Sequence, residues 1–136
     1  MNREIIRDQF FLRMPSRPAT AADAGIADDL ADTLRANADR CVGMAANMIG
    51  QSVRIIVFFD NGQCMEMFNP VIVKKDSPFD CEEGCLSLDG VRPTRRYKSI
   101  KVQWQTRDMK PRVKGFTGFT AQIIQHEIDH LSGIII

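Results

Sequence analysis

The spacing of apolar residues predicts a helix in the first third of the chain. Between Thr20 and Arg40, apolar positions recur at intervals of three and four, which places them on one face of a helix. They are Ala24, Ala27, Leu30, Ala31, Leu34 and Ala38. Thr20 can cap this helix, and Asp23 three residues later is an acidic variant of the capping box. The charged residues in between are expected to face solvent.

After this helix the pattern becomes that of β-strands. Val53–Phe59 is a run of β-branched and aromatic residues, which is typical of a buried strand. Asn61 and Gly62 follow it, and this pair is the strongest short signal for a tight hairpin turn. We therefore expect Cys64–Phe68 to return as the antiparallel partner strand.

Weaker patterns predict three further strands and a break. Asn69 and Pro70 are expected to interrupt the chain before the next strand. The three predicted strands cover residues 71–73, 100–104 and 111–116. Alternation in the second of them places Ile100, Val102 and Trp104 on one side of the sheet.

The last predicted element is a helix from about Phe119 to Leu131, which ends at Gly133. The side chains expected on its inner face are Phe119, Ile123, His126 and His130. The elements together predict an α+β fold, with mainly antiparallel β-sheets packed around this C-terminal helix and a further helix near the N-terminus.

Length and charge narrow the class of protein. At 136 residues, without a linker or repeat, the chain fits a single domain over residues 1–136. A net charge of +1 gives no reason to expect a nucleic acid or an anionic membrane as partner. The sequence shows neither the apolar run of a signal peptide nor a stretch long enough to span a bilayer. Four cysteines without a secretion signal favour free thiols or metal ligands, so a cytoplasmic protein is predicted.

The candidate chemistry is concentrated in an HExxH motif at residues 126–130. His126 and His130 lie one turn apart on one helix face, which suits a single divalent metal. Glu127 can act as general base on a metal-bound water. A catalytic site of this type takes three protein ligands and leaves one position open. The six residues after the motif offer no ligand, so the third ligand is predicted upstream.

The third ligand is a cysteine or a carboxylate, because the chain has no other histidine. Among the four cysteines, Cys85 has the most unusual setting, in the segment EEGCLS, where Gly84 lets the backbone turn beside the thiolate. This chemistry favours Cys85, although spacing alone leaves Cys81 as an alternative. For Cys41, Cys64 and Cys81 a small buried thiol is the favoured interpretation.

Three segments together resemble the motifs of the peptide deformylase family, in the same order along the chain. Residues 83–87 read EGCLS and residues 125–130 read QHEIDH, and both match the family fully. Residues 43–48 read GMAANM and resemble the first motif, but Met48 stands where the family has glutamine. Cys41 also replaces a glycine that is common two residues before Gly43. The α+β fold around a metal-binding HExxH helix agrees with this resemblance.

The resemblance implies a metal-dependent hydrolase that removes the N-formyl group from N-formylmethionyl peptides. Cys85, His126 and His130 would bind one divalent cation, with Glu127 as the base. The family favours Fe2+ in the cell, and Zn2+, Ni2+ or Co2+ suit the same ligands. The peptide substrate also implies nascent chains at the ribosome as a partner. We expect neither a membrane nor direct nucleic-acid binding.

Met48 changes what the resemblance implies for catalysis. In the family, the oxyanion of the tetrahedral intermediate is bound by the backbone N–H at the position of Leu86 and by the glutamine of the first motif. A methionine cannot donate a hydrogen bond, and loss of one such donor costs on the order of 100- to 1000-fold in kcat. Asn47 and Gln51 are the neighbouring candidates for a compensating donor.

A second functional class therefore stays open, a deformylase-like metal-binding protein with weak or no turnover that serves in peptide binding or metal sensing. The retained Glu127 favours the hydrolase, because metal binding alone needs no base. An HExxH endopeptidase is disfavoured by the missing downstream ligand and by EGCLS. The candidate substrate contacts are Gly43, Val42, Phe119, Ile123 and Arg92.

These five contacts are proposed for different reasons. Val42, Phe119 and Ile123 offer an apolar pocket for a methionine side chain, although each could be a plain core residue. Gly43 would let a peptide backbone pair closely with its own. Arg92 could bind substrate carbonyls or a carboxylate, and an ordinary surface arginine is the alternative. Glu83 is expected to have a structural role, paired with Arg95 or Arg96.

Overall fold

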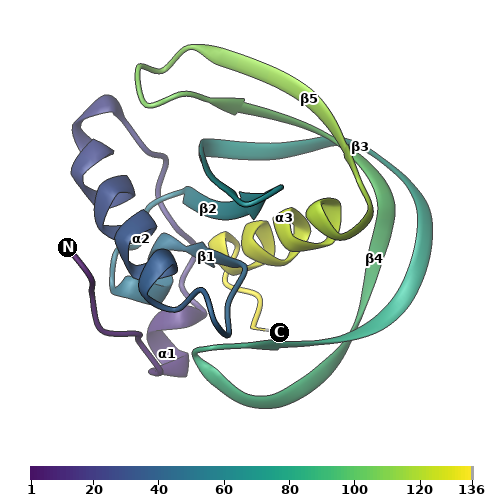
Figure 1. Cartoon of the computed structure of the whole chain (residues 1–136), viewed down its shortest axis with the longest axis horizontal. Helices are drawn as coiled ribbons and strands as arrows, with labels where there is room; N and C mark the ends of the chain where they lie inside the picture. Colours follow the sequence, from purple (N-terminus) through teal and green to yellow (C-terminus); the bar gives the residue numbers. More distant parts are fainter. Residues whose placement is uncertain (136) are drawn as a thin grey trace.

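The strands form one antiparallel sheet in the computed structural model, which describes residues 1–135. Their bounds are Gly43–Ala45 (β1), Ile55–Asp60 (β2), Gln63–Cys85 (β3), Leu88–Gln105 (β4) and Pro111–Thr117 (β5). Each strand pairs with the next one along the chain, in the order β1-β2-β3-β4-β5. Figure 1 shows the long β3–β4 hairpin and β5 curving around the helix α3, Gly118–Leu131. The predicted α+β class is confirmed.

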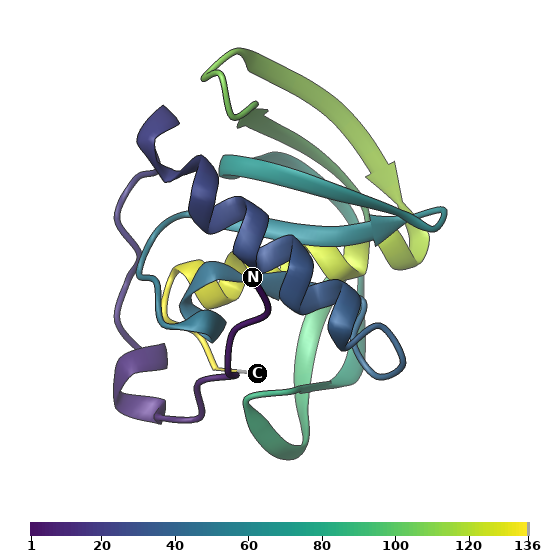
Figure 2. The same ribbon diagram turned by 60° about the vertical axis from the view of Figure 1, so that its left-hand side comes forward.

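Four shorter helical segments lie before the second strand. They are α1 (Gln9–Leu12), the 3-10 turn η1 (Ala21–Asp23), α2 (Ala24–Ala36) and the 3-10 turn η2 (Ala46–Ile49). Figure 2 shows α2 crossing one face of the sheet, with α3 behind it on the other side. In the part of the chain that the structure describes, no helix is long and apolar enough to cross a membrane.

The predicted N-terminal helix is present but shorter than expected. Its first turn is the 3-10 segment η1, in which the Thr20 backbone N–H donates to the Asp23 carboxylate at 2.8 Å. The regular helix α2 ends at Ala36 and does not continue to Arg40. It ends there because the Asn37 side-chain amide donates to the Thr33 carbonyl at 2.8 Å, which satisfies an acceptor left free at the helix end.

The predicted hairpin between the second and third strands is confirmed. Asp60 pairs with Gln63, so the turn contains only Asn61 and Gly62. Both residues have positive φ, 50° and 81°, which is the backbone shape that this residue pair favours in hairpins.

The predicted chain break at Asn69 and Pro70 is wrong. Asn69 adopts φ 52°, and the register shifts between Phe68 and Val71, so the two residues form a bulge within one continuous strand. Residues 71–73 therefore belong to β3, which continues to Cys85. The pairing of residues 74–85 with β4 was not predicted, because most of these side chains are exposed and one of the inward-facing positions is the charged Glu83.

The later strands agree with the predicted alternation. Ile100 and Val102 are buried, and Trp104 packs on the same cluster, while 111–116 forms β5 with one further residue. The two faces of the sheet have separate cores. One core joins α2 and η2 to the sheet, and the other joins α3 to the sheet.

The last helix begins one residue before the predicted start and ends at the predicted residue, Leu131. Gly133 has φ 79° just after it, as expected for a helix stop. Ile123, His126 and His130 are buried, as predicted. Phe119 is not an inner-face residue, since 63% of it is exposed in the first turn of the helix. At the other end, the buried Asn47 amide donates to the His130 carbonyl at 2.9 Å and joins η2 to α3.

Candidate metal centre and active site

Three predicted metal ligands lie together in the structure. Cys85 is the last residue of β3, and His126 and His130 are one turn apart in α3. One potential ligand atom from each lies within 4.8 Å of the others. In the part of the chain that the structure describes, Cys85, His126 and His130 form a group whose ligand atoms lie close enough together to hold a metal ion.

Nδ1 of each imidazole already has a hydrogen-bond partner, so Nε2 of each ring is left for the metal site. His126 Nδ1 lies 2.7 Å from Glu83 Oε1, and His130 Nδ1 lies 3.1 Å from the Ile134 carbonyl. His130 Nε2 is buried without a hydrogen-bond partner in residues 1–135. A buried, unpartnered nitrogen beside a thiol and a second imidazole fits a divalent cation.

Glu83 is the centre of a buried network that supports His126. Arg96 donates to both of its carboxylate oxygens at 2.7–3.0 Å, and the Gln122 amide donates to Oε2 at 2.8 Å. Arg96 also binds Asp129, inside the HExxH motif, at 2.6 Å. Of the two arginines proposed as partners of Glu83, Arg96 is the one in contact, whereas Arg95 pairs with Asp80 on the surface.

Cys81, the alternative third ligand, belongs to this supporting network. Its sulfur lies 3.7 Å from the Glu83 carboxylate and 3.7 Å from the Gln122 amide nitrogen, and it is not in the cluster of three ligand atoms. The geometry therefore favours Cys85 over Cys81. The predicted buried-thiol interpretation holds in part, because Cys41, Cys64 and Cys81 are all free and only partly buried.

The two histidines have pKa values that move in opposite directions. Burial lowers the pKa of His126, but hydrogen bonds with Cys85 and Glu83 outweigh burial and raise it to about 10. Burial and the neighbouring His126 lower the pKa of His130 to about 3. The Glu83 carboxylate and the Cys85 sulfur thus favour positive charge at His126, whereas burial disfavours it at His130.

Glu127 has the environment of a general base. It is 5% exposed, and its Oε1 is buried without a hydrogen-bond partner in the described part of the chain. Burial raises the pKa of Glu127 to about 7, although the charge of His126 lowers it. A carboxyl group with a pKa near neutrality can both take and return a proton at physiological pH.

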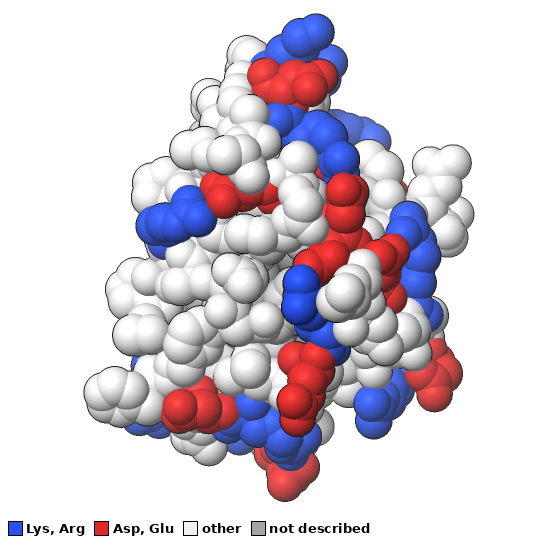
Figure 3. All heavy atoms as spheres, turned by 90° about the vertical axis from the view of Figure 1, so that its left-hand side faces the viewer, with Lys and Arg blue, Asp and Glu red and all other residues white. Residues whose placement is uncertain are grey.

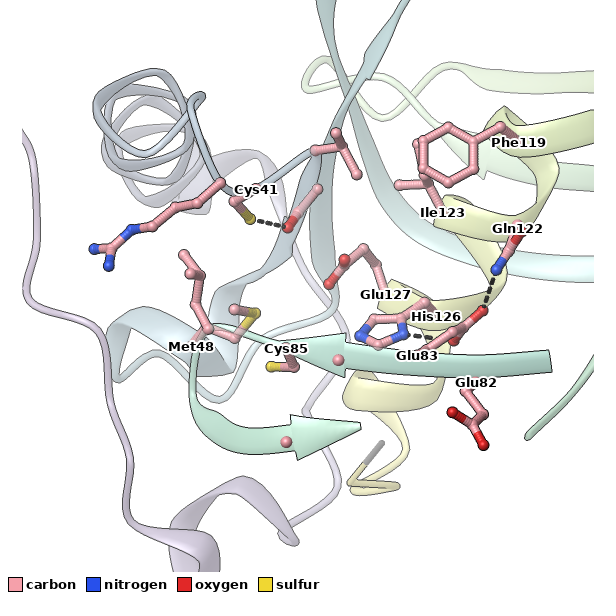
Figure 4. Close-up of a pocket in the computed structure, with 16 residues that line it drawn as sticks. Cys41, Met48, Glu82, Glu83, Cys85, Phe119, Gln122, Ile123, His126 and Glu127 are labelled. Atoms are coloured by element: carbon pink, nitrogen blue, oxygen red, sulfur yellow. Dashed lines mark hydrogen bonds and ion pairs between the residues drawn. The ribbon is translucent and has the colours of Figure 1, made fainter. Parts of the chain in front are cut away.

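Cys85, His126 and Glu127 line a cavity of about 430 Å³, whereas His130 does not reach its wall. Figure 4 shows Glu127 and His126 between two walls, with Cys41 and Met48 on one side and Phe119 and Gln122 on the other. The predicted contacts Gly43, Val42, Phe119 and Ile123 all line the cavity, as does Leu86. Arg92 does not line it. Its guanidinium donates to the Asp89 carbonyl at 3.4 Å, so the structure does not bring this predicted contact to the site.

Met48 also lines the cavity, at the position predicted for an oxyanion donor. It is 2% exposed and packs in the core cluster that includes Cys85 and Leu86 at its border. Neither proposed substitute donor lines the cavity. The Asn47 amide is directed to His130, and Gln51 is exposed.

Several cavity residues were not predicted from the sequence, among them Gln122, Arg40 and Cys41. Gln122 lies one turn before His126 on α3, so the helical spacing could have placed it on the same side. Arg40 and Cys41 lie directly before the first motif, and the Cys41 thiol donates to the Gly43 carbonyl at 2.9 Å. Burial raises the pKa of Cys41 to about 12, so this thiol stays protonated.

Comparison with known proteins agrees with this geometry. The family model described as polypeptide deformylase matches residues 4–136. A peptide deformylase of Clostridium beijerinckii is 52% identical over 136 residues, which cover 100% of both chains. A ligand-bound crystal structure of a class I type b peptide deformylase from Acinetobacter baumannii has a TM-score of 0.89 and 30% identity, covering 99% of this chain and 97% of that one.

A second structure of the Acinetobacter baumannii enzyme contains Met-Ala-Ser. It has a TM-score of 0.89 and 27% identity, and the match covers 99% of this chain and 97% of that one. A family match over nearly the whole sequence, a full-length relative and the same fold lead to one conclusion. The chain belongs to the peptide deformylase family of metal-dependent hydrolases, which act on formylated peptides.

Proposed function

We propose that this chain hydrolyses N-formylmethionyl peptides to formate and a free amino terminus, with Glu127 as general base. Cys85, His126 and His130 are the proposed ligands of one divalent cation. The observation that carries the assignment is the convergence of the three ligand atoms beside the buried Glu127 carboxylate, next to one cavity. A bound cation would polarise the formyl carbonyl and lower the pKa of water toward neutrality.

The protein's residues then have distinct tasks. Glu127 takes a proton from the attacking water while the water oxygen bonds to the formyl carbon. It returns that proton to the amine nitrogen as the C–N bond breaks. The Leu86 backbone N–H, in the turn after Cys85, is the proposed donor to the oxyanion. Met48 supplies no second donor, so we expect slower turnover than that of an otherwise equal site with glutamine.

Val42, Phe119 and Ile123 are the proposed apolar contacts for the first side chain of the peptide, and Gly43 lies beside them. The Acinetobacter baumannii relative with Met-Ala-Ser bound supports a methionyl peptide as the occupant. Nascent chains at the ribosome are the expected source of formylated peptides, which would place the reaction in the cytoplasm.

We propose Fe2+ as the metal used in the cell, although Zn2+, Ni2+ and Co2+ suit the same ligands. A thiolate beside Fe2+ would make the enzyme sensitive to oxygen, through oxidation of the metal or of Cys85. Anaerobic purification with metal analysis tests this proposal. Unchanged activity and metal content after exposure to air would contradict it.

The decisive experiment measures formate release from N-formylmethionyl peptides by anaerobically prepared protein, beside the Glu127→Ala variant. We expect turnover in the parent protein and its loss in Glu127→Ala. No turnover with any of the four metals would contradict the hydrolase. It would favour a protein that binds metal and peptide without catalysis.

A further inference from the structure

Arg7 contacts the turn that carries the proposed metal ligand Cys85, although it lies 78 positions before it in the sequence. Arg7 Nη1 donates to the Leu86 carbonyl at 3.0 Å, and Nη2 pairs with the Asp89 carboxylate at 2.8 Å. The guanidinium fork therefore holds the turn between β3 and β4 at two points. No task in the proposed mechanism uses this arginine.

The peptide group that Arg7 contacts is also bonded to the Cys85 sulfur. The Leu86 carbonyl and the Ser87 N–H belong to one planar peptide unit. The Ser87 N–H donates to Cys85 Sγ at 3.4 Å, while the carbonyl oxygen accepts from Arg7. Arg7, this peptide unit and the sulfur thus form one chain of hydrogen bonds that ends at the proposed ligand.

The backbone on both sides of this chain is fixed. Ser87 is 2% exposed, so its peptide unit cannot rotate freely into solvent. Next to Arg7, the Ile6 N–H donates to the Met48 carbonyl at 2.8 Å. The N-terminal segment therefore joins η2 to the Cys85 turn. It runs along the face shown in Figure 3, where acidic and basic side chains are interspersed.

We infer that Arg7 is a positioning residue for the metal ligand Cys85. A cation on the carbonyl oxygen polarises the peptide unit and makes its N–H a stronger donor, because charges along a hydrogen-bonded chain reinforce one another. A stronger N–H bond to sulfur withdraws negative charge from the thiolate and fixes its direction. Residues that support metal ligands in this way tune metal affinity, and their loss typically costs about 10- to 100-fold.

Structural stabilisation is the competing explanation, and it is weak here. The Arg7 side chain is 55% exposed and that of Asp89 is 99% exposed. Ion pairs this accessible contribute little to the free energy of folding. The effect of Arg7 is therefore expected at the sulfur and not in the unfolding free energy.

The test uses Co2+, whose bond to a thiolate gives an ultraviolet charge-transfer absorption band. The inference rests on the proposed function, since it requires Cys85 to bind the metal. In the Arg7→Gln variant we expect the band to move to lower energy, because the sulfur regains negative charge. We also expect Co2+ to bind about tenfold more weakly, because loss of the fixed sulfur direction outweighs this gain in charge. Arg7→Lys keeps a cation near the Leu86 carbonyl but loses the fork, so it should restore part of both properties.

Arg3→Gln is the matched control, because Arg3 lies in the same segment and pairs with Asp29 at 2.8 Å, away from the metal turn. It should leave the band unchanged. Asp89→Asn removes only the outer anchor of Arg7 and should shift the band in the same direction by less. This variant also keeps the test valid should Arg7→Gln fail to fold.

The possible results distinguish a failure of the proposed function from a failure of the role of Arg7. A parent protein without a thiolate-to-Co2+ band would contradict Cys85 as a ligand, and with it the proposed function. A parent band that neither Arg7→Gln nor Asp89→Asn moves would contradict the role of Arg7 alone. Equal shifts in Arg7→Gln and Arg3→Gln would show that docking of the whole segment matters, and would overturn the specific role of Arg7.

Discussion

A Cβ atom added to Gly43 would lie 3.0 Å from Oε2 of Glu127. It would also lie 2.7 Å from Cγ2 of Ile123, on the same face of α3. Real Cβ atoms essentially never make a contact as short as the one to Ile123, so Ile123 would have to move, and Glu127 would have to shift by a few tenths of an ångström. The close approach of β1 to α3 therefore favours a glycine here, independently of any pairing with a substrate backbone.

The first prediction concerns Gly43→Ala. The new methyl group should displace Ile123 and shift Glu127 by a few tenths of an ångström, which should lower kcat several-fold. A full shift of about 1 Å at a reacting group would cost on the order of 100-fold. Gly25→Ala is the control, since nothing lies within 4 Å of a Cβ at that position of α2. It should leave kcat unchanged and stabilise the fold by about 0.5–1 kcal/mol. A Gly43→Ala enzyme with the parent kcat would contradict the steric argument.

The second prediction concerns Met48→Gln. The amide would place a hydrogen-bond donor at the cavity wall, and kcat should rise by about tenfold or more as the oxyanion gains a partner. Stability should fall by about 1–3 kcal/mol, because Met48 is 2% exposed and packs in an apolar cluster. Formate release and thermal unfolding, measured on the same samples, separate the two effects.

Met44→Gln is the control for that substitution. Met44 is fully buried in the same cluster but does not line the cavity. It should lose stability without any gain in kcat. If Met48→Gln is also no faster than the parent protein, then another group already binds the oxyanion or the step is not rate-limiting.

The sequence indicated the proposed ligand set, which the structure brings close together, because each candidate lies in a short motif with its own chemistry. The histidines are fixed relative to one another by helical spacing alone, and the fold had only to bring Cys85 to them. Phe119 shows where periodicity fails. It has the spacing of the inner face, but it lies in the first turn of α3, where it lines the open cavity and stays 63% exposed.

Long-range contacts were harder to predict. Nothing in the sequence near Arg92 or Arg7 distinguishes one surface arginine from another, yet Arg92 lies outside the cavity and Arg7 contacts the metal turn. Where Arg92 and Arg7 lie relative to the site depends on the register of the β3–β4 hairpin and on the path of the N-terminal segment. Neither has a periodic signal, because the side chains of residues 74–78 are exposed and the segment before α1 is irregular.

The third prediction concerns the buried pair of Glu83 and Arg96, whose side chains are only 8% and 4% exposed. Glu83→Gln should destabilise the protein by about 3 kcal/mol, because it leaves the Arg96 cation buried with only Asp129 as its acidic partner. It should also weaken metal binding, since His126 loses its carboxylate partner. Asp80→Asn breaks the exposed pair with Arg95 and should cost less than about 1 kcal/mol. Equal losses for the two variants would contradict this account.

The same carboxylate predicts how stability depends on pH. Burial raises the pKa of Glu83, but hydrogen bonds from His126, Arg96 and Gln122 outweigh it and lower the pKa from 4.5 to about 2. A depressed pKa gives stability that is present above pH 4.5 and is lost as the pH falls toward 2. The difference in unfolding free energy between the parent protein and Glu83→Gln should therefore shrink over this range. Urea denaturation at several pH values measures it, and a constant difference would contradict an ionised Glu83.

The last prediction concerns the pH dependence of catalysis. Burial raises the pKa of Glu127 to about 7 without a metal, and a bound cation would lower it again. Since the proposed base must be ionised to accept a proton, kcat/KM should fall on the acid side, with an apparent pKa below about 7. Glu127→Gln should lose on the order of 10²–10⁴-fold in rate and lose this acid limb, because an amide does not titrate. An acid limb that persists unchanged in the residual activity of Glu127→Gln would assign the titration to another group, and the role of Glu127 would then have to be rejected.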